Sequence, residues 1–344
     1  MICKERVLNC INRLDFDRIP CNFRAEEPTL KRLFEHVGHY DYDKLLCDLH
    51  IDTRFVDSIA PGEKDYGDFI QNYWGERYIY TQSQWGKVRH NLPGVLREAE
   101  SLQELEDFSW PTVDMMDYSG LKKRCEKYSD YAIIYGSGDI FTRPSLVRDI
   151  EPFLIDMHDN PEFVHFLAGK FTDFYIEDYT RAQKESDNGI DIFICYTDLA
   201  TQRGPFFSPL MFDEFLAPYL KRLADRVHDL GALLFFHTCG ESYDFFDRLI
   251  NCGVDIIDPI QRTSDKMAPE RLKADFGSRV CFHGGIDVQT TLPYGTPEEV
   301  RAEVRRYIDV FKESGGYICS SAHFMQHDTP PENIIAMYDE IHKL

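Results

Sequence analysis

The chain has 344 residues, of which 43% are hydrophobic and 28% charged, and its formal net charge is −21. This composition is typical of a globular protein whose core needs no covalent staples, and it argues against a disordered chain. The strong negative charge disfavours nucleic acid and anionic membrane surfaces as partners, because the summed field of the protein would repel phosphate.

Cysteine content and the first residues indicate the compartment. Ten cysteines are scattered without the spacing of a small disulfide scaffold, and several lie in apolar runs, so we expect reduced thiols. Residues 1–6 carry charge where a signal peptide needs an apolar core, and no run approaches the roughly 18 apolar residues of a membrane span. These features predict a cytoplasmic protein with no membrane partner.

Helical and strand patterns alternate from the start of the chain. Apolar residues at helical spacing predict a short helix within residues 1–18, and strands are predicted at 19–24 and 51–56 with helical segments between them. Residues 57–97 break this rhythm, because they are rich in turns and aromatic residues. They predict a small hairpin insertion after the second strand, placed to cover the site as a lid.

Six further apolar runs predict strands three to eight, at residues 131–138, 190–196, 233–237, 254–258, 279–287 and 316–321. Helical patterns separate or follow these runs, so a parallel sheet is expected. Eight units with no leftover strand favour a closed (β/α)8 TIM barrel over an open doubly wound sheet. Since no repeat or linker divides the sequence, we predict a single α/β domain over residues 1–344.

The fifth predicted strand ends in a histidine and a cysteine, His237 and Cys239. Side chains two apart on extended backbone point the same way, with Cα atoms roughly 6.5–7 Å apart, so both can reach one ion. Zinc accepts both ligand types, and two or three protein ligands leave a position open for substrate. The alternative interpretation is a core cysteine beside a hydrogen-bonded histidine, because H-x-C alone is a short pattern.

Polar residues at the ends of other predicted strands extend this site. In such barrels the working residues lie where strands end on the C-terminal face, and metal-type ligands follow strands five, six and eight here. We therefore predict a metal site made by His237, Cys239 and either His323 or Cys319, with Asp258 as a further candidate ligand.

Charged residues near the first two strands are candidates for substrate binding. Arg24 leaves the first strand, and Asp52 and Arg54 share one face of the second. The two arginines suit an anionic group of the substrate. Alternatively, they simply pair with Asp52 or Glu26.

Four further polar residues follow the fourth and seventh predicted strands. Asp198 and Gln202 are candidates for catalysis or substrate orientation, with capping of the next helix as the alternative. His283 and Asp287 are candidates for substrate binding, with structural hydrogen bonding beneath the site as the alternative. No glycine-rich loop has the spacing of a nucleotide-binding fingerprint.

Five segments together form a recognisable pattern: DLATQRGP (198–205), FHTCG (236–240), GVDIIDPIQ (253–261), FHGGID (282–287) and TPPENI (329–334). They resemble the uroporphyrinogen decarboxylase superfamily, and most of all its corrinoid-dependent methyltransferase branch. The resemblance spans nearly the whole chain and implies the same barrel. Members of this branch bind zinc through H-x-C and a distant cysteine near the end of the last strand. The resemblance thus implies His237 and Cys239 as ligands, with His323 or Cys319 near the third position.

The resemblance implies a zinc-dependent methyltransferase of one-carbon metabolism. Such an enzyme moves a methyl group from a methylated corrinoid, methylcobalamin carried on a partner corrinoid protein, to a small acceptor such as a coenzyme M type thiol or tetrahydrofolate. Zinc would hold an acceptor thiol as thiolate at neutral pH.

Two alternatives to methyl transfer remain. One is a uroporphyrinogen decarboxylase-like carboxy-lyase. The acidic chain disfavours this activity, because a substrate with many carboxylates calls for a cationic pocket. In addition, Arg24 is the one arginine kept from the family's R-Q-A-G-R signature. The other is a non-catalytic corrinoid- or metal-binding protein on the same fold.

Overall fold

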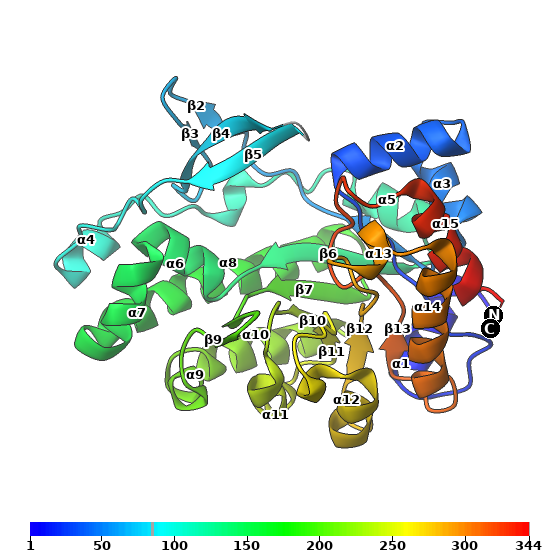
Figure 1. Cartoon of the computed structure of the whole chain (residues 1–344). Coiled ribbons are helices and arrows are strands. Elements are labelled where there is room, and N and C mark those ends of the chain that lie inside the picture. Colours follow the sequence, from blue (N-terminus) through cyan, green and yellow to red (C-terminus); the bar gives the residue numbers. More distant parts are fainter. Residues whose placement is uncertain (84–85, 344) are drawn as a thin grey trace.

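A parallel sheet of seven strands forms the centre of the protein (Figure 1). The computed structural model describes residues 1–83 and 86–343. In sheet order the strands are β1 (Thr53–Val56), β6 (Ala132–Gly138), β7 (Ile192–Tyr196), β10 (Leu233–His237), β11 (Ile256–Asp258), β12 (Cys281–His283) and β13 (Tyr317–Ile318). The register places His237 opposite Tyr196 on one side and Asp258 on the other. The predicted parallel α/β sheet is thereby confirmed.

The first predicted strand, at residues 19–24, is a bridged segment between the two edges of this sheet. Cys21 forms a parallel bridge with Cys319 beyond β13, and the Asn22 N–H donates to the Cys319 carbonyl (3.0 Å). On the other side, the Asp52 N–H donates to the Cys21 carbonyl (3.1 Å) just before β1. Pro20 has no N–H to donate, which limits the ladder here. The predicted eight strands are therefore seven strands and one bridged segment.

Side chains of the strands alternate between two packed clusters, as extended backbone requires. The inner cluster joins the strands to helix α1 (Cys3–Ile11) and consists of Val7, Ile11, Ala132, Ile134, Ile192, Ile194, Phe235, Ile256, Cys281 and Ile318. Intervening residues such as Ile133, Phe193 and Phe236 belong to the larger cluster that packs under the surrounding helices. Helix α1 packs on this inner cluster through Val7 and Ile11, and it lies beside the start of β6, where the Lys4 N–H donates to the Asp130 carbonyl (2.8 Å).

Helices follow most of the strands and surround the sheet (Figure 1). Their apolar faces are buried, and α10 shows the pattern with Leu220, Leu223, Ala224 and Val227 at helical spacing. The helices after α1 are α2 (Glu27–Val37), α3 (Tyr42–Asp48), α4 (Leu102–Glu106), α5 (Leu121–Lys127), α6 (Thr142–Arg148), α7 (Ile150–Asp159), α8 (Pro161–Glu185), α9 (Pro209–Phe215), α10 (Ala217–Asp229), α11 (Phe246–Asn251), α12 (Pro269–Phe276), α13 (Thr291–Tyr294), α14 (Pro297–Phe311) and α15 (Pro331–Ile341).

The segment after β1 contains a small antiparallel sheet rather than a single hairpin. Its strands are β2 (Lys64–Asp65), β3 (Ile70–Gln71), β4 (Arg77–Ser83) and β5 (Gly86–Asn91). Residues 84–85, the turn of the predicted hairpin, lie outside the described residues. Trp74 anchors this sheet, because its ring stacks on Phe171 of α8 with 4.2 Å between centroids and meets Phe174 edge-on. A second short ladder joins β8 (Ala200–Thr201) to β9 (Gly204–Pro205) after β7.

The ten cysteines are free in the structure, in agreement with the expected reduced thiols. Within residues 1–83 and 86–343, no helix combines the length and the apolar character that crossing a membrane requires.

Candidate metal centre

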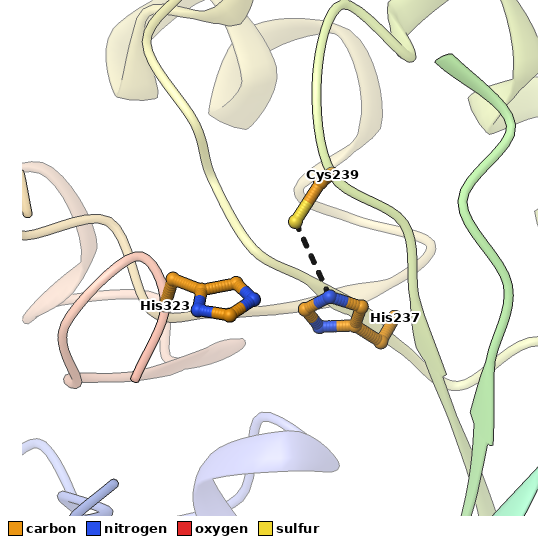
Figure 2. A group of neighbouring side chains, drawn as sticks. All are labelled: His237, Cys239 and His323. Carbon is orange, nitrogen blue, oxygen red and sulfur yellow. Dashed lines mark hydrogen bonds between the residues drawn. The ribbon is translucent and has the colours of Figure 1, made fainter. Parts of the chain in front are cut away.

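His237, Cys239 and His323 converge beyond the C-terminal ends of β10 and β13 (Figure 2). One ligand atom from each lies within 4.8 Å of the other two, and the Cys239 sulfur is 3.3 Å from His237 Nε2. The first two side chains come from one extended segment, as the H-x-C spacing predicted. His323 comes from the loop after β13, and its ring centroid is 5.7 Å from that of His237.

This donor set fits a zinc ion. Tetrahedral zinc with imidazole and thiolate ligands needs donor atoms about 3.3–3.8 Å apart, and the group is close to that size already. Burial, followed by the charges of His237 and Arg24, lowers the pKa of His323, so its imidazole is neutral and able to bind a cation. Burial and then the nearby Asp198 raise the pKa of the Cys239 thiol, and a bound cation would reverse that effect.

Asp258, at the end of β11, orients the first histidine from below. Its Oδ2 contacts His237 Nδ1 in a short hydrogen bond and accepts from Arg24 Nη1 (2.8 Å), while Oδ1 accepts from Arg24 Nη2 (2.8 Å) and contacts His283 Nδ1 (2.5 Å). Burial opposes this charge, but Arg24, His283 and His237 together hold the pKa of Asp258 well below its usual range. The carboxylate therefore fixes the His237 tautomer that leaves Nε2 free for a metal.

Asp258 is accordingly a support for His237, and the ligand group of the described residues does not include it. His283 lies still deeper and is fully buried; its Nε2 is 3.0 Å from Asn22 Nδ2, while Asn22 Oδ1 accepts from the Thr53 hydroxyl (2.8 Å). Burial lowers the pKa of His283 although Asp258 opposes this. Of its two predicted roles, the geometry favours the structural one beneath the site. Asn22 was not predicted, and only its place two residues before Arg24 could have indicated it.

The two candidates for catalysis lie on the loop after β7. Asp198 Oδ1 accepts from the Cys239 N–H (2.8 Å) and lies 3.9 Å from His237 Nε2, with its side chain 42% exposed. This carboxylate borders the candidate ligand group and does not cap the next helix. Gln202 is exposed on the turn between β8 and β9 and lines the polar cavity described below.

Asp52 and Arg54 do not belong to the site, contrary to the prediction. Asp52 precedes β1, is fully buried, and pairs with Arg6 (2.7 Å) and Arg18 (2.8 Å). Arg54 donates to main-chain carbonyls, and its guanidinium lies 3.7 Å from the ring centroid of Tyr131. Both residues lie near the start of the strand, whereas the site lies beyond the strand ends.

The remaining candidates are separated from the three ligands. Cys319 is fully buried and its neighbour across the bridge is Cys21, so the described ligand group contains His323 and not Cys319. Asp287 accepts from the N–H of Gln289 (2.7 Å) and from the Thr290 hydroxyl, which makes it a loop-organising residue at the rim.

One cavity is lined by two of the three candidate ligands, and a second lies next to them. The polar cavity has a volume of about 340 Å³, and its walls include Gln202, Cys239 and His323. The aromatic cavity has a volume of about 560 Å³ and is lined by Phe23, Arg24, Ala25, Tyr42, Phe55, Asp57, Ser58, Ala60, Tyr73, Met116, Tyr135, Gly136, Ser137, Phe174, Tyr175, Asp178, Tyr196 and Phe324.

Tyr196 and Phe324 join the aromatic cavity to the ligands. The Tyr196 ring centroid is 5.1 Å from that of His237, and Phe324 directly follows His323. Neither residue was predicted. Tyr196 ends β7, so its position at a strand exit was the available signal.

The chain is similar in sequence to one protein family and to curated proteins of that name. Residues 96–344 match the model of the family described as Uroporphyrinogen decarboxylase (URO-D). A uroporphyrinogen decarboxylase of Xanthomonas oryzae pv. oryzae is 27% identical over 195 residues, which cover 54% of this chain and 51% of the relative. The chloroplastic uroporphyrinogen decarboxylase 2 of Oryza sativa subsp. japonica is 29% identical over 185 residues, covering 52% and 43%. The matched segment thus spans about half the length of these curated relatives or less.

A solved structure has the same fold over the whole chain. A methyltransferase from Methanosarcina mazei superposes with a TM-score of 0.73, covering 100% of this chain and 99% of the other, at 15% identity. At that identity the likeness concerns the fold alone.

Proposed function

The chain belongs to the uroporphyrinogen decarboxylase family, and from this membership and its ligand group we propose that it is a zinc-dependent methyltransferase acting on a methylated corrinoid. The observation that carries the proposal is the convergence of His237, Cys239 and His323 within 4.8 Å. Bound there, zinc would supply Lewis acidity that keeps an acceptor thiol deprotonated at neutral pH.

The protein's own groups have separate tasks in this proposal. His237, Cys239 and His323 hold the ion, with Asp258 fixing the ring of His237 through Nδ1. Asp198 is placed beside the ligands with an exposed carboxylate, where it can accept the proton released by the acceptor thiol and pass it to water.

The reaction is a displacement at the methyl carbon. The acceptor sulfur or nitrogen forms the new bond to carbon, the cobalt–carbon bond breaks with its electron pair on cobalt, and methylcob(III)alamin becomes cob(I)alamin. The donor would come on a partner corrinoid protein, and the acceptor would be a small thiol or a tetrahydrofolate-type pterin. Two separate cavities beside the ligands support a reaction that brings two substrates together.

Decarboxylation of a porphyrinogen is the competing function, because the curated relatives carry that name. A substrate with many carboxylates needs several free cations. Arg24 is the one cation among the described residues lining the aromatic cavity, and both of its terminal nitrogens are bonded to Asp258. The donor set and the charge of the cavity therefore favour methyl transfer.

Activity assays separate the two functions. The purified, zinc-loaded protein is incubated with methylcobalamin and either a thiol or a tetrahydropterin, and in parallel with uroporphyrinogen. We expect cob(I)alamin to form with at least one acceptor and no coproporphyrinogen to form. Coproporphyrinogen without any demethylation would establish the decarboxylase instead.

A further inference from the structure

The aromatic cavity has a composition that suits one class of ligand. Aromatic rings from many separate segments form its walls, among them Tyr42, Phe55, Tyr73, Phe174 and Tyr196. The negative faces of such rings attract a cation placed against them, and several rings around one space strengthen this attraction.

Two carboxylates, Asp57 and Asp178, line this cavity, and the cations that influence them, Arg124 and Arg181, are not among its lining residues. Neither Asp57 nor Asp178 forms an ion pair with any residue of 1–83 or 86–343, and both line the cavity. Arg24, the lining cation, is already paired with Asp258 at 2.8 Å. Among the described residues that line the cavity, carboxylates therefore outnumber cations, in a protein whose net charge is −21.

The charge of Asp178 is held in place by hydroxyl groups. The Tyr118 hydroxyl donates to its Oδ1 (2.6 Å), and the Tyr135 hydroxyl donates to the same atom (2.9 Å) while lying 2.8 Å from Ser58 Oγ. Burial raises the pKa of Asp178 to about 6, and the hydrogen bonds from Tyr118 and Tyr135 oppose that rise. Each contact stabilises the ionised form and fixes its position.

A further polar group of the wall, the Tyr175 hydroxyl, lacks a hydrogen-bond partner among the residues that the structure describes. Tyr175 is only 2% exposed, so water does not replace the hydrogen bond that its hydroxyl lacks. A buried hydroxyl left unpaired is costly, so a ligand that supplied a hydrogen-bonding group here would be favoured.

We propose that the aromatic cavity binds a small organic cation, a substituted ammonium group with an apolar body, between its rings and the carboxylates of Asp57 and Asp178. The same carboxylates repel sulfonates and carboxylates, so the cavity selects against anionic ligands. Its role as the place of a methyl-transfer substrate rests on the proposed function. Binding of the cation does not, because no metal ligand lines this cavity.

Calorimetric titration with two probes of equal shape tests this assignment. Choline carries a quaternary ammonium, and 3,3-dimethyl-1-butanol replaces that nitrogen with carbon. We expect the full-length protein to bind choline at least about tenfold more tightly than the neutral alcohol. Asp178→Asn and Asp57→Asn should each weaken choline binding about tenfold and leave alcohol binding unchanged, since each removes one facing charge.

Asp173→Asn is the matched control, because Asp173 lies on α8 with Asp178 but pairs with Arg222 at the surface. It should bind choline as the wild type does. Equal affinity of the wild type for the two probes would overturn the proposal, as would an equal loss in the control. The wild-type comparison and Asp57→Asn decide the matter even if Asp178→Asn fails to fold.

The metal-free variant Cys239→Ala separates this proposal from the proposed function. It should bind choline with wild-type affinity, because Cys239 lines the other cavity. Choline binding without methyl transfer in the zinc-loaded wild type would refute the proposed function alone. Methyl transfer without any preference for the cation would refute the cavity assignment alone.

Discussion

Replacing Asp258 by asparagine removes the carboxylate charge that connects Arg24, His237 and His283. The Arg24 side chain is 2% exposed, so loss of its partner leaves a buried guanidinium unpaired. Breaking a buried pair in this way costs about 3–5 kcal/mol of unfolding free energy. We also expect zinc affinity to fall about tenfold, because the amide oxygen orients His237 but no longer strengthens its basicity.

Urea unfolding and competitive zinc titration measure the two effects separately. The double variant Arg24→Met/Asp258→Asn should recover stability, because it removes both charges, while zinc affinity stays low. Asp247→Asn is the control: Asp247 pairs with Arg279 on the surface, and its loss should cost at most about 1 kcal/mol. A single Asp258 variant as stable as this control, with unchanged zinc affinity, would contradict the reasoning.

The stability supplied by Asp258 should also depend on pH. The pKa of Asp258 is lowered in the folded protein, so its contribution is fully present above the unfolded value of about 3.9. It is lost as the pH falls from there toward the folded pKa. The difference in unfolding free energy between wild type and Asp258→Asn should therefore be constant near neutrality and shrink below about pH 4. A difference that grows in acid would show that another group carries it.

Three further outcomes follow from the placement of other side chains. His323→Ala should reduce the zinc content measured by elemental analysis, whereas Cys319→Ala should retain it; the opposite result would make Cys319 the third ligand. Arg54→Met should lower the unfolding free energy and leave methyl transfer unchanged, because Arg54 packs on Tyr131 outside the site, and a loss of turnover at equal zinc content would refute this. Trp74→Ala should destabilise the protein by about 3–5 kcal/mol in urea unfolding, since the ring is buried against α8, and a loss below 1 kcal/mol would show that the small sheet is not anchored there.

Periodicity in the sequence was sufficient to predict most of the sheet. Seven of the eight apolar runs are strands, because a strand buried on both faces leaves a continuous apolar run that is hard to miss. Residues 19–24 pair through isolated contacts, such as the bridge of Cys21 to Cys319 and the bond from the Met325 N–H to the Arg24 carbonyl (3.0 Å). This pairing depends on the spacing of two distant sheet edges. The four-stranded insertion was underestimated because β2 and β3 have two residues each, too few for any period.

The candidate site was predictable where ligands follow a strand directly. His237 and Cys239 are fixed by alternation alone, whereas His323 depends on the path of a loop that no local pattern describes. Asp52 precedes β1 and Arg54 lies within it, so neither side chain is at the end of the strand where the candidate site lies. The residue at the exit of β1 is Asp57, which follows Val56 and lines the aromatic cavity.

The most direct test follows the visible spectrum of methylcob(III)alamin mixed with the zinc-loaded protein and a thiol acceptor under anaerobic conditions. Wild type and Cys319→Ala should convert it to cob(I)alamin at equal rates, and Cys239→Ala should not convert it. Conversion by Cys239→Ala at the wild-type rate, or no conversion by a wild type shown to hold one zinc per chain, would contradict the account.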